Sequence, residues 1–137
     1  MDYLPIFLDI RGKKVVVDGG GTVAARRAAR ALAAGAMVQV FDAELCEEFR
    51  ELSANPNLAH FKRPAEENDL IGSAVVYGAS EDSARDKGLH AAAKSVAVLL
   101  NVADVAEYCD FITPSVVDRS PLVVAISSGG AAPVIAR

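Results

Sequence analysis

The stretch KVVVDGGGTVA, residues 14–24, decides the fold of this chain of 137 residues. It opens with a β-branched run, Lys14 to Val17, which is typical of a buried parallel strand. After the glycines, residues 22–34 place small apolar side chains on one face of a helix, and Gly35 is suited to end that helix. A strand, a glycine loop and a helix in this order predict a Rossmann-type unit with a dinucleotide site at the loop.

The glycine loop fits the pattern G-x-G-x-x-G/A. Its residues are Gly19, Gly20, Gly21, Thr22, Val23 and Ala24. The first glycine of the pattern permits a tight turn, the second lets the backbone approach a pyrophosphate, and the final small residue lets helix and strand pack closely. The N–H groups at the start of the helix favour the phosphates. A glycine-rich turn without a ligand is the alternative that these residues leave open.

Two acidic residues bear on the choice of cofactor. Asp18 directly precedes the glycines, where a carboxylate would repel phosphate unless it points away or is hydrogen-bonded. Asp42 follows the expected strand 37–41, where an acidic residue binds ribose hydroxyls and favours NAD over NADP. An ordinary turn aspartate is the alternative at that position. We expect Ala43, Ala79 and Ser80 to complete the NAD site.

Strands and helices alternate through about residue 104. Beyond the first unit we expect helices at 44–54 and 81–94 and strands at 58–61, 73–77 and 96–100. This alternation predicts an α/β fold, a Rossmann-type parallel sheet with helices on both faces. Two further strands, 111–114 and 122–126, follow without a helix between them, and residues 127–133 resemble the start of a helix. Because so short a helix is unstable alone, we expect more chain to follow Arg137.

Composition excludes several classes of protein. The net charge of −4 disfavours a nucleic-acid binder, and no apolar run approaches the roughly 18 residues of a membrane span. The first residues lack the pattern of a signal peptide, so we expect a cytoplasmic protein. Cys46 and Cys109 fit no metal-ligand spacing, and His60 and His90 are isolated, so no dedicated metal site is expected.

Four strings in a fixed order carry a family resemblance. They are DYLPIF at 2–7, NVAD at 101–104, FITPSVVDRSPL at 111–122 and AISSGGAAP at 125–133. Together with the glycine loop they resemble the N-terminal module of siroheme synthase, the precorrin-2 dehydrogenase/sirohydrochlorin ferrochelatase family. The resemblance covers essentially the whole chain. Asp18 and Asp42 depart from it, because the family usually has an apolar residue at the first position and a small or neutral one at the second.

The resemblance implies two reactions in one pocket. Precorrin-2, a tetrapyrrole, is oxidised by NAD⁺ to sirohydrochlorin, and ferrous iron then enters as a substrate to give siroheme. One aspartate, here Asp104, is implied as the proton acceptor of both steps, although without the resemblance it would be a loop or cap residue. The implied substrate-binding residues are Asn101, Arg119, Ser127, Ser128 and Gly129. A helix N-cap is the alternative for the serines.

The resemblance also implies the organisation of the chain. Residues 1–111 are expected to form the NAD-binding Rossmann domain, and residues 112–137 the start of a truncated dimerisation and tetrapyrrole-binding segment, which makes the protein a homodimer. Because Rossmann domains also occur without chemistry, a sensing or structural NAD-binding module is the alternative, as is an inactive member of the family.

Overall fold

The computed structural model describes residues 1–129. The chain divides into two compact units, one formed by Leu8–Asp110 and the other by Met1–Phe7 with the chain from Phe111 onward. Residues 1–7, which were expected to belong to the first domain, thus group with the second unit. Among the described helices, none is long and apolar enough to cross a membrane.

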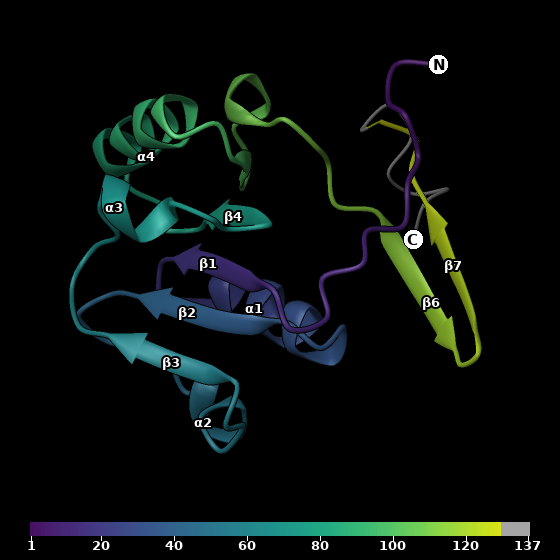
Figure 1. The fold of residues 1–137 in the computed structure, drawn as a ribbon, viewed down its shortest axis with the longest axis horizontal. Coiled ribbons are helices and arrows are strands. Elements are labelled where there is room, and N and C mark those ends of the chain that lie inside the picture. The colour runs from purple at the N-terminus through teal and green to yellow at the C-terminus, as the bar shows by residue number, and fades with distance from the viewer. Residues whose placement is uncertain (130–137) are drawn as a thin grey trace. The chain divides into compact units, whose positions relative to one another are not determined.

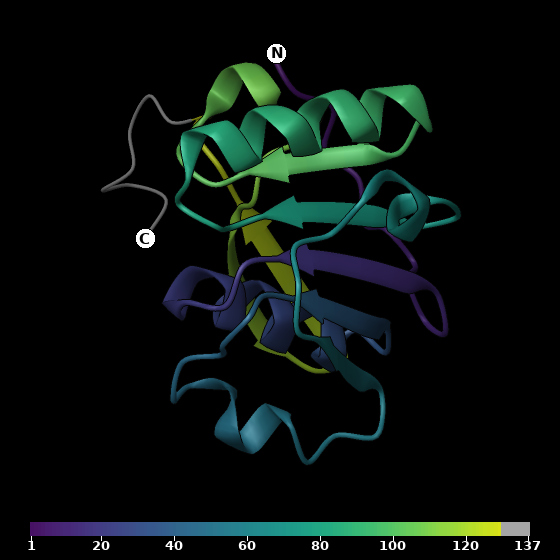
Figure 2. The same cartoon turned by 90° about the vertical axis from the view of Figure 1, so that its left-hand side faces the viewer.

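The larger unit is built on a five-stranded parallel sheet with the spatial order β3-β2-β1-β4-β5 (Figure 2). In chain order the strands are β1 (Lys14–Asp18), β2 (Met37–Phe41), β3 (Leu58–Phe61), β4 (Val75–Gly78) and β5 (Leu99–Val102). The order reverses between β1 and β4, and such a switch point is where open α/β sheets bind ligands. The predicted Rossmann-type fold is confirmed.

Helix α1 (Thr22–Ala33) covers one face of the sheet. Its buried residues are Ala24, Ala25, Ala28, Ala31 and Leu32. Because successive side chains of a strand point to opposite faces, Val15 and Val17 of β1 belong to the face that α1 covers. The guanidinium of Arg27 lies 6.0 Å from the centre of the Tyr77 ring, so α1 also reaches β4 on this face. Helix α2 (Phe49–Leu52) has only four residues, of which Phe49 is buried.

Helices α3 (Glu67–Leu70) and α4 (Ser83–Ser95) cover the other face (Figures 1 and 2). The core on this side comprises Val16, Phe41, Leu70, Val76, Leu89, Ala93, Leu100 and Val102. Gly78 permits the close approach of α4, because a Cβ there would lie 3.0 Å from both Leu89 Cδ2 and Val102 Cγ2. Asp18 lies two residues after Val16 in β1, so its side chain points to the same face of the sheet as that of Val16.

Several predicted elements differ from the structure. The helix expected at 44–54 is only α2, and β5 begins at Leu99 rather than at residue 96. The shift of β5 follows from α4, which runs to Ser95 and is followed by a turn with Ala97 at φ +56°. Two short helices, α3 and the 3₁₀ helix η1 (Ala106–Tyr108), were not expected.

The smaller unit contains an antiparallel hairpin of β6 (Ser115–Arg119) and β7 (Leu122–Ile126). The strand predicted at 111–114 is wrong, since β6 starts only after Pro114, and a proline cannot donate to a strand ladder. Five apolar side chains of the hairpin are 40–64% exposed: Val117, Leu122, Val123, Val124 and Ile126. Residues 127–129 are not helical, and the remainder of the predicted helix start, through Pro133, lies outside the described residues.

Candidate functional site

The carboxyl ends of the strands form one edge at which four loops meet. Backbone hydrogen bonds extend the ladder past the strand ends. Gly19 N donates to Phe41 O at 2.9 Å, Ala79 N to Asp18 O at 2.8 Å, and Ala103 N to Gly78 O at 2.9 Å. The loops that carry the predicted cofactor residues are therefore fixed to one another by main-chain contacts.

The glycine loop is too tightly packed for other residues at two of its positions. Gly19 has φ +142°, and a Cβ there would collide with the carbonyl oxygen of Ala79. A Cβ on Gly20 would collide with the carbonyl oxygen of Glu44. Gly21 differs, because a Cβ there would meet no atom of the described part of the chain within 4 Å. The loop is thus closed toward the protein and open at Gly21.

The start of α1 is an uncapped helix terminus. Gly21 is its N-cap residue, no side chain among residues 1–129 caps it, and no acidic residue lies in the first turn. The first N–H groups of a helix have no intrahelical acceptor and attract anions. Thr22 and Gly21 are exposed and Val23 is half-buried, so these groups are open to solvent. An open glycine and a free helix start fit the pyrophosphate of a dinucleotide.

Glu48 is a neighbour of this loop that sequence reasoning missed. Its Oε2 accepts hydrogen bonds from Cys46 Sγ at 2.9 Å and Thr22 Oγ1 at 2.8 Å. Both hydrogen bonds lower the pKa of the Glu48 carboxyl below its usual value, and the bond from Cys46 has the larger effect. No local pattern marks Glu48, because it meets Thr22 only through the fold.

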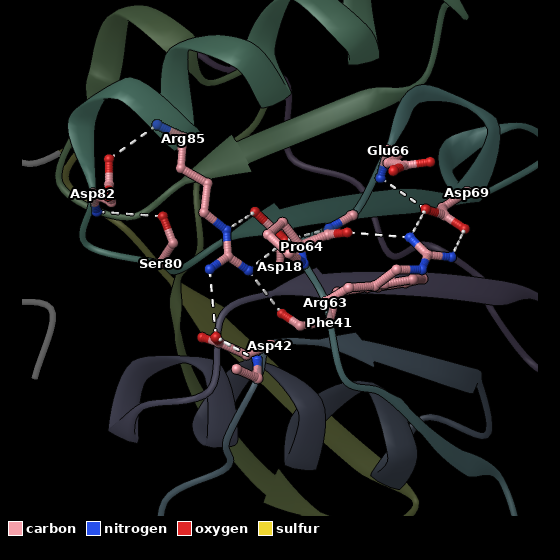
Figure 3. Close-up of polar contacts among 12 residues, drawn as sticks. Asp18, Phe41, Asp42, Arg63, Pro64, Glu66, Asp69, Ser80, Asp82 and Arg85 are labelled. Carbon is pink, nitrogen blue, oxygen red and sulfur yellow. Dashed lines mark hydrogen bonds and ion pairs between the residues drawn. The ribbon is translucent and has the colours of Figure 1, made fainter.

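Asp18 is buried and paired instead of facing the phosphate loop. Its side chain is 1% exposed and accepts from Arg85 of α4, with Arg85 Nε at 3.0 Å from Oδ2 and Nη2 at 2.8 Å from Oδ1 (Figure 3). Ala65 N donates to the same Oδ1 at 2.9 Å. The carboxylate is therefore held on the α4 face of the sheet, which removes the conflict that its position in the sequence suggested.

Arg85 also connects the ends of β1 and β2. Its Nη2 donates to Phe41 O at 2.9 Å, and its Nη1 lies 3.4 Å from Asp42 Oδ1. The hydrogen bond to Asp18 is the largest of the effects that raise the pKa of the Arg85 guanidinium, so the side chain stays charged. Asp42 Oδ1 accepts from Ala43 N at 2.8 Å, and the Asp42 side chain is 27% exposed.

The loop after β4 is ordered by its own side chains. Ser80 Oγ donates to Asp86 Oδ1 at 2.9 Å and accepts from Asp82 N at 3.3 Å. Asp82 in turn caps α4 by accepting from Arg85 N at 3.1 Å. Ala79 borders Gly19 directly, whereas the Ser80 hydroxyl is engaged within its own loop.

The end of β5 borders an open hollow of about 480 Å³. Asp104 lines it and is exposed, with the unusual backbone angle φ +63°. The other lining residues are Glu81, Ser83, Asp86, Ala103, Val105, Glu107 and Tyr108. Asn101 lies in β5 itself and is 6% exposed. The structure thus places Asp104 on the same sheet edge as the glycine loop, but leaves Asn101 largely covered.

The remaining predicted residues belong to the smaller unit. Arg119 ends β6 and is exposed, as is Ser127, whose Oγ accepts from Gly129 N at 3.0 Å. Ser128 is half-buried. Because these residues belong to the other unit, they stay predictions as parts of a common site. Among residues 1–129, no group of three or more metal-ligating side chains comes together.

Comparisons with known proteins agree with this architecture. A family model described as "Putative NAD(P)-binding" matches residues 6–115. The chain is 44% identical over 137 residues to the siroheme synthase of Nitrosococcus oceani and 42% identical to that of Photorhabdus laumondii, covering 100% of this chain and 29% of each relative. It therefore spans less than a third of the length of these curated relatives. The resemblance to siroheme synthases is confirmed.

A solved structure is also similar along nearly the whole chain. SirC, precorrin-2 dehydrogenase, superposes with a TM-score of 0.80 at 29% sequence identity, covering 98% of this chain and 66% of that one.

Proposed function

This chain belongs to the NAD(P)-binding family that matches residues 6–115, and we propose that it is a precorrin-2 dehydrogenase of siroheme biosynthesis. The substrates of the reaction are precorrin-2 and NAD⁺, and the products are sirohydrochlorin and NADH. One observation carries the proposal. A single sheet edge joins an open, uncapped helix start to an exposed aspartate in a hollow. The similarity to siroheme synthases and to SirC supports the choice of substrate.

The cofactor is held by the loops after β1 and β2. The open backbone at Gly21 and the N–H groups of Thr22 and Val23 bind the pyrophosphate. Asp42 follows β2, where a carboxylate accepts hydrogen bonds from the ribose hydroxyls. When bound, NAD⁺ supplies a hydride acceptor. The contacts of Ala43, Ala79 and Ser80 with the cofactor belong to the same proposal.

Asp104 is the catalytic residue of the proposal. Oxidation of precorrin-2 releases a proton from the macrocycle, and the Asp104 carboxylate accepts it as general base. Its exposure in the hollow leaves the carboxylate accessible to a large substrate.

A second activity is proposed for the same residue. Insertion of ferrous iron into sirohydrochlorin displaces two pyrrole N–H protons, and Asp104 would accept a proton in that step as well. The support is the resemblance of the strings around residues 101–104 and 111–122 to the two-activity family. Substrate carboxylates would pair with Arg119, and the backbone and hydroxyl donors of 127–129 would add hydrogen bonds.

The hairpin supports the proposal of a homodimer. Val117, Leu122, Val124 and Ile126 are exposed on the same face of the hairpin, and a second copy of the chain can cover this face. A cytoplasmic location is also proposed, because Cys46 and Cys109 are free thiols, which suit a reducing compartment.

The test is an anaerobic assay with precorrin-2 and NAD⁺. We expect NADH and sirohydrochlorin to appear together, and addition of ferrous iron then yields siroheme. Binding of NADH without turnover would contradict the dehydrogenase and favour a sensing module or an inactive family member. Absence of any NADH binding would contradict the cofactor site itself.

A further inference from the structure

The structure assigns to Arg85 a role in choosing the cofactor. We propose that Asp18 locks the Arg85 guanidinium beside Asp42, so that the site takes a dinucleotide with a free 2′-hydroxyl and rejects one with a 2′-phosphate. This inference rests on the proposed function, since it concerns the same NAD site. It adds a residue on α4 that no pattern around the glycine loop indicates.

Most of the donors of the Arg85 guanidinium are occupied. An arginine side chain has five N–H donors, and four hydrogen bonds are made here, two to Asp18, one to Phe41 O and one to Asp42. The two bonds to Asp18 form the bidentate arrangement of 2.8 and 3.0 Å, whereas the contact with Asp42 is a single one of 3.4 Å. Arg85 is therefore held mainly by Asp18.

The charges of Asp18, Asp42 and Arg85 do not cancel. The three side chains carry two carboxylates and one guanidinium, which leaves one negative charge. Asp18 is 1% exposed and bidentately paired, so Arg85 compensates it first. Asp42 is 27% exposed and more weakly paired, so the remaining negative charge resides there. A free Arg85 would instead neutralise Asp42 or bind a phosphate.

Asp42 lies next to the expected place of the adenosine ribose. It directly follows β2, and a Cβ on Gly20 would lie 3.1 Å from Asp42 Cβ, so Asp42 borders the glycine loop. In Rossmann folds the adenosine ribose binds at this place, with its 2′ position near the residue that ends the second strand. The net negative charge therefore faces the group that distinguishes NAD from NADP.

The experiment removes the charge of Asp18 that holds Arg85 and changes no residue that the proposed function places against the cofactor. In Asp18→Asn the side chain keeps its shape but loses its charge, so the guanidinium becomes available beside Asp42. We expect the ratio of the NADPH to the NADH dissociation constants, measured by fluorescence titration at fixed salt, to fall about tenfold relative to the unmodified chain. A purely structural role of Asp18 would weaken both cofactors alike and leave the ratio unchanged.

The matched control is the double variant Asp18→Asn/Arg85→Met. Without the guanidinium the preference for NADH should return, and a ratio that stays low would overturn the inference. If Asp18→Asn does not fold, as judged by circular dichroism, Asp18→Val replaces it, with the same expected fall in the ratio. The double variant Asp18→Val/Arg85→Met then serves as its control.

The outcomes separate the inference from the proposed function. If the unmodified chain binds neither NADH nor NADPH, both ideas fail. If it binds NADH but Asp18→Asn leaves the ratio of dissociation constants unchanged, the role of Arg85 is refuted while the cofactor site stands. If the unmodified chain already prefers NADPH, the inference is also refuted.

Discussion

Asp104 adopts a left-handed backbone conformation, φ +63°, that few residues other than glycine, asparagine and aspartate tolerate. We predict that Asp104→Asn keeps the fold, because asparagine accepts this conformation, but lowers kcat of precorrin-2 oxidation by about 100-fold or more. The affinity for NADH should stay the same. Steady-state kinetics and a binding titration check both parts. Glu107→Gln, in the same hollow, is the control and should retain activity. An active Asp104→Asn enzyme would end the assignment.

Substitutions at Gly21 and Gly19 are expected to have different effects: the first on cofactor binding and the second on stability. Because a Cβ there meets no protein atom within 4 Å, Gly21→Ala should change the free energy of unfolding by less than about 0.5 kcal/mol. The added methyl group would enter the space of the pyrophosphate, so NADH should bind about tenfold more weakly, roughly 1.4 kcal/mol. Gly19→Ala should instead destabilise the fold by about 1–3 kcal/mol, because its Cβ would collide with Ala79. Equal effects of both variants on stability would contradict this division.

Some residues of the site could be predicted from the sequence and others could not. Gly19 to Ala24 are predictable because strand, turn and helix are contiguous, and the fold confirms their expected order. The partner of Asp18 was not predictable, because Arg85 lies 67 residues away and reaches it only across the packed face of α4. Glu48 was missed for the same reason, since its contact with Thr22 spans 26 residues.

At the scale of elements, α3 is stabilised by an ion pair that titrates. Arg63 donates to both oxygens of Asp69, at 2.7 and 2.9 Å, and Glu66 with Asp69 forms a capping box. The hydrogen bond from Arg63 is the main cause that lowers the pKa of the Asp69 carboxyl below its usual value. Its stabilising effect is therefore present above the ordinary aspartate pKa and is lost as the pH falls through the lower, folded-state value.

We predict that Asp69→Asn lowers the free energy of unfolding at pH 7 by about 0.5–1 kcal/mol, a modest value because Arg63 is 43% exposed and solvent screens the pair. The difference between variant and unmodified chain should shrink as the pH falls from about 4 to about 2. Urea denaturation across this range measures it. A difference that does not depend on pH would contradict the prediction, because it would show that the charge of Asp69 does not stabilise the fold.

The short helices are the elements that sequence patterns fail to place. Helices α2 and α3 span four residues each, too few for a helical period to be recognised. The pair Glu66 and Asp69 is a capping signal that could have indicated α3. The long helices α1 and α4 and the strands β2, β3 and β7 lie close to their predicted ranges, because periodicity extends over their whole length.

At the scale of the molecule, the exposed hairpin predicts association. Apolar residues on β6 and β7 are 40–64% exposed, so we expect a dimer by light scattering at micromolar concentration. Val124→Lys should shift the population toward monomer by placing a charge on this surface. The exposed Glu67→Lys, on α3 of the other unit, is the control and should leave the dimer intact. A monomer at all concentrations would contradict the proposal.

The main-chain bonds that extend the ladder past β1, β4 and β5 have a consequence for the dynamics of the sheet edge. The amide protons of Gly19, Ala79 and Ala103 are engaged across the strands even though these residues lie in loops. We expect them to exchange with deuterium as slowly as core amides, through global unfolding instead of local opening. Fast exchange at these three amides would show that the edge opens locally. Slow exchange would mean that nucleotide meets a surface already in its final shape, so that little ordering entropy opposes its binding.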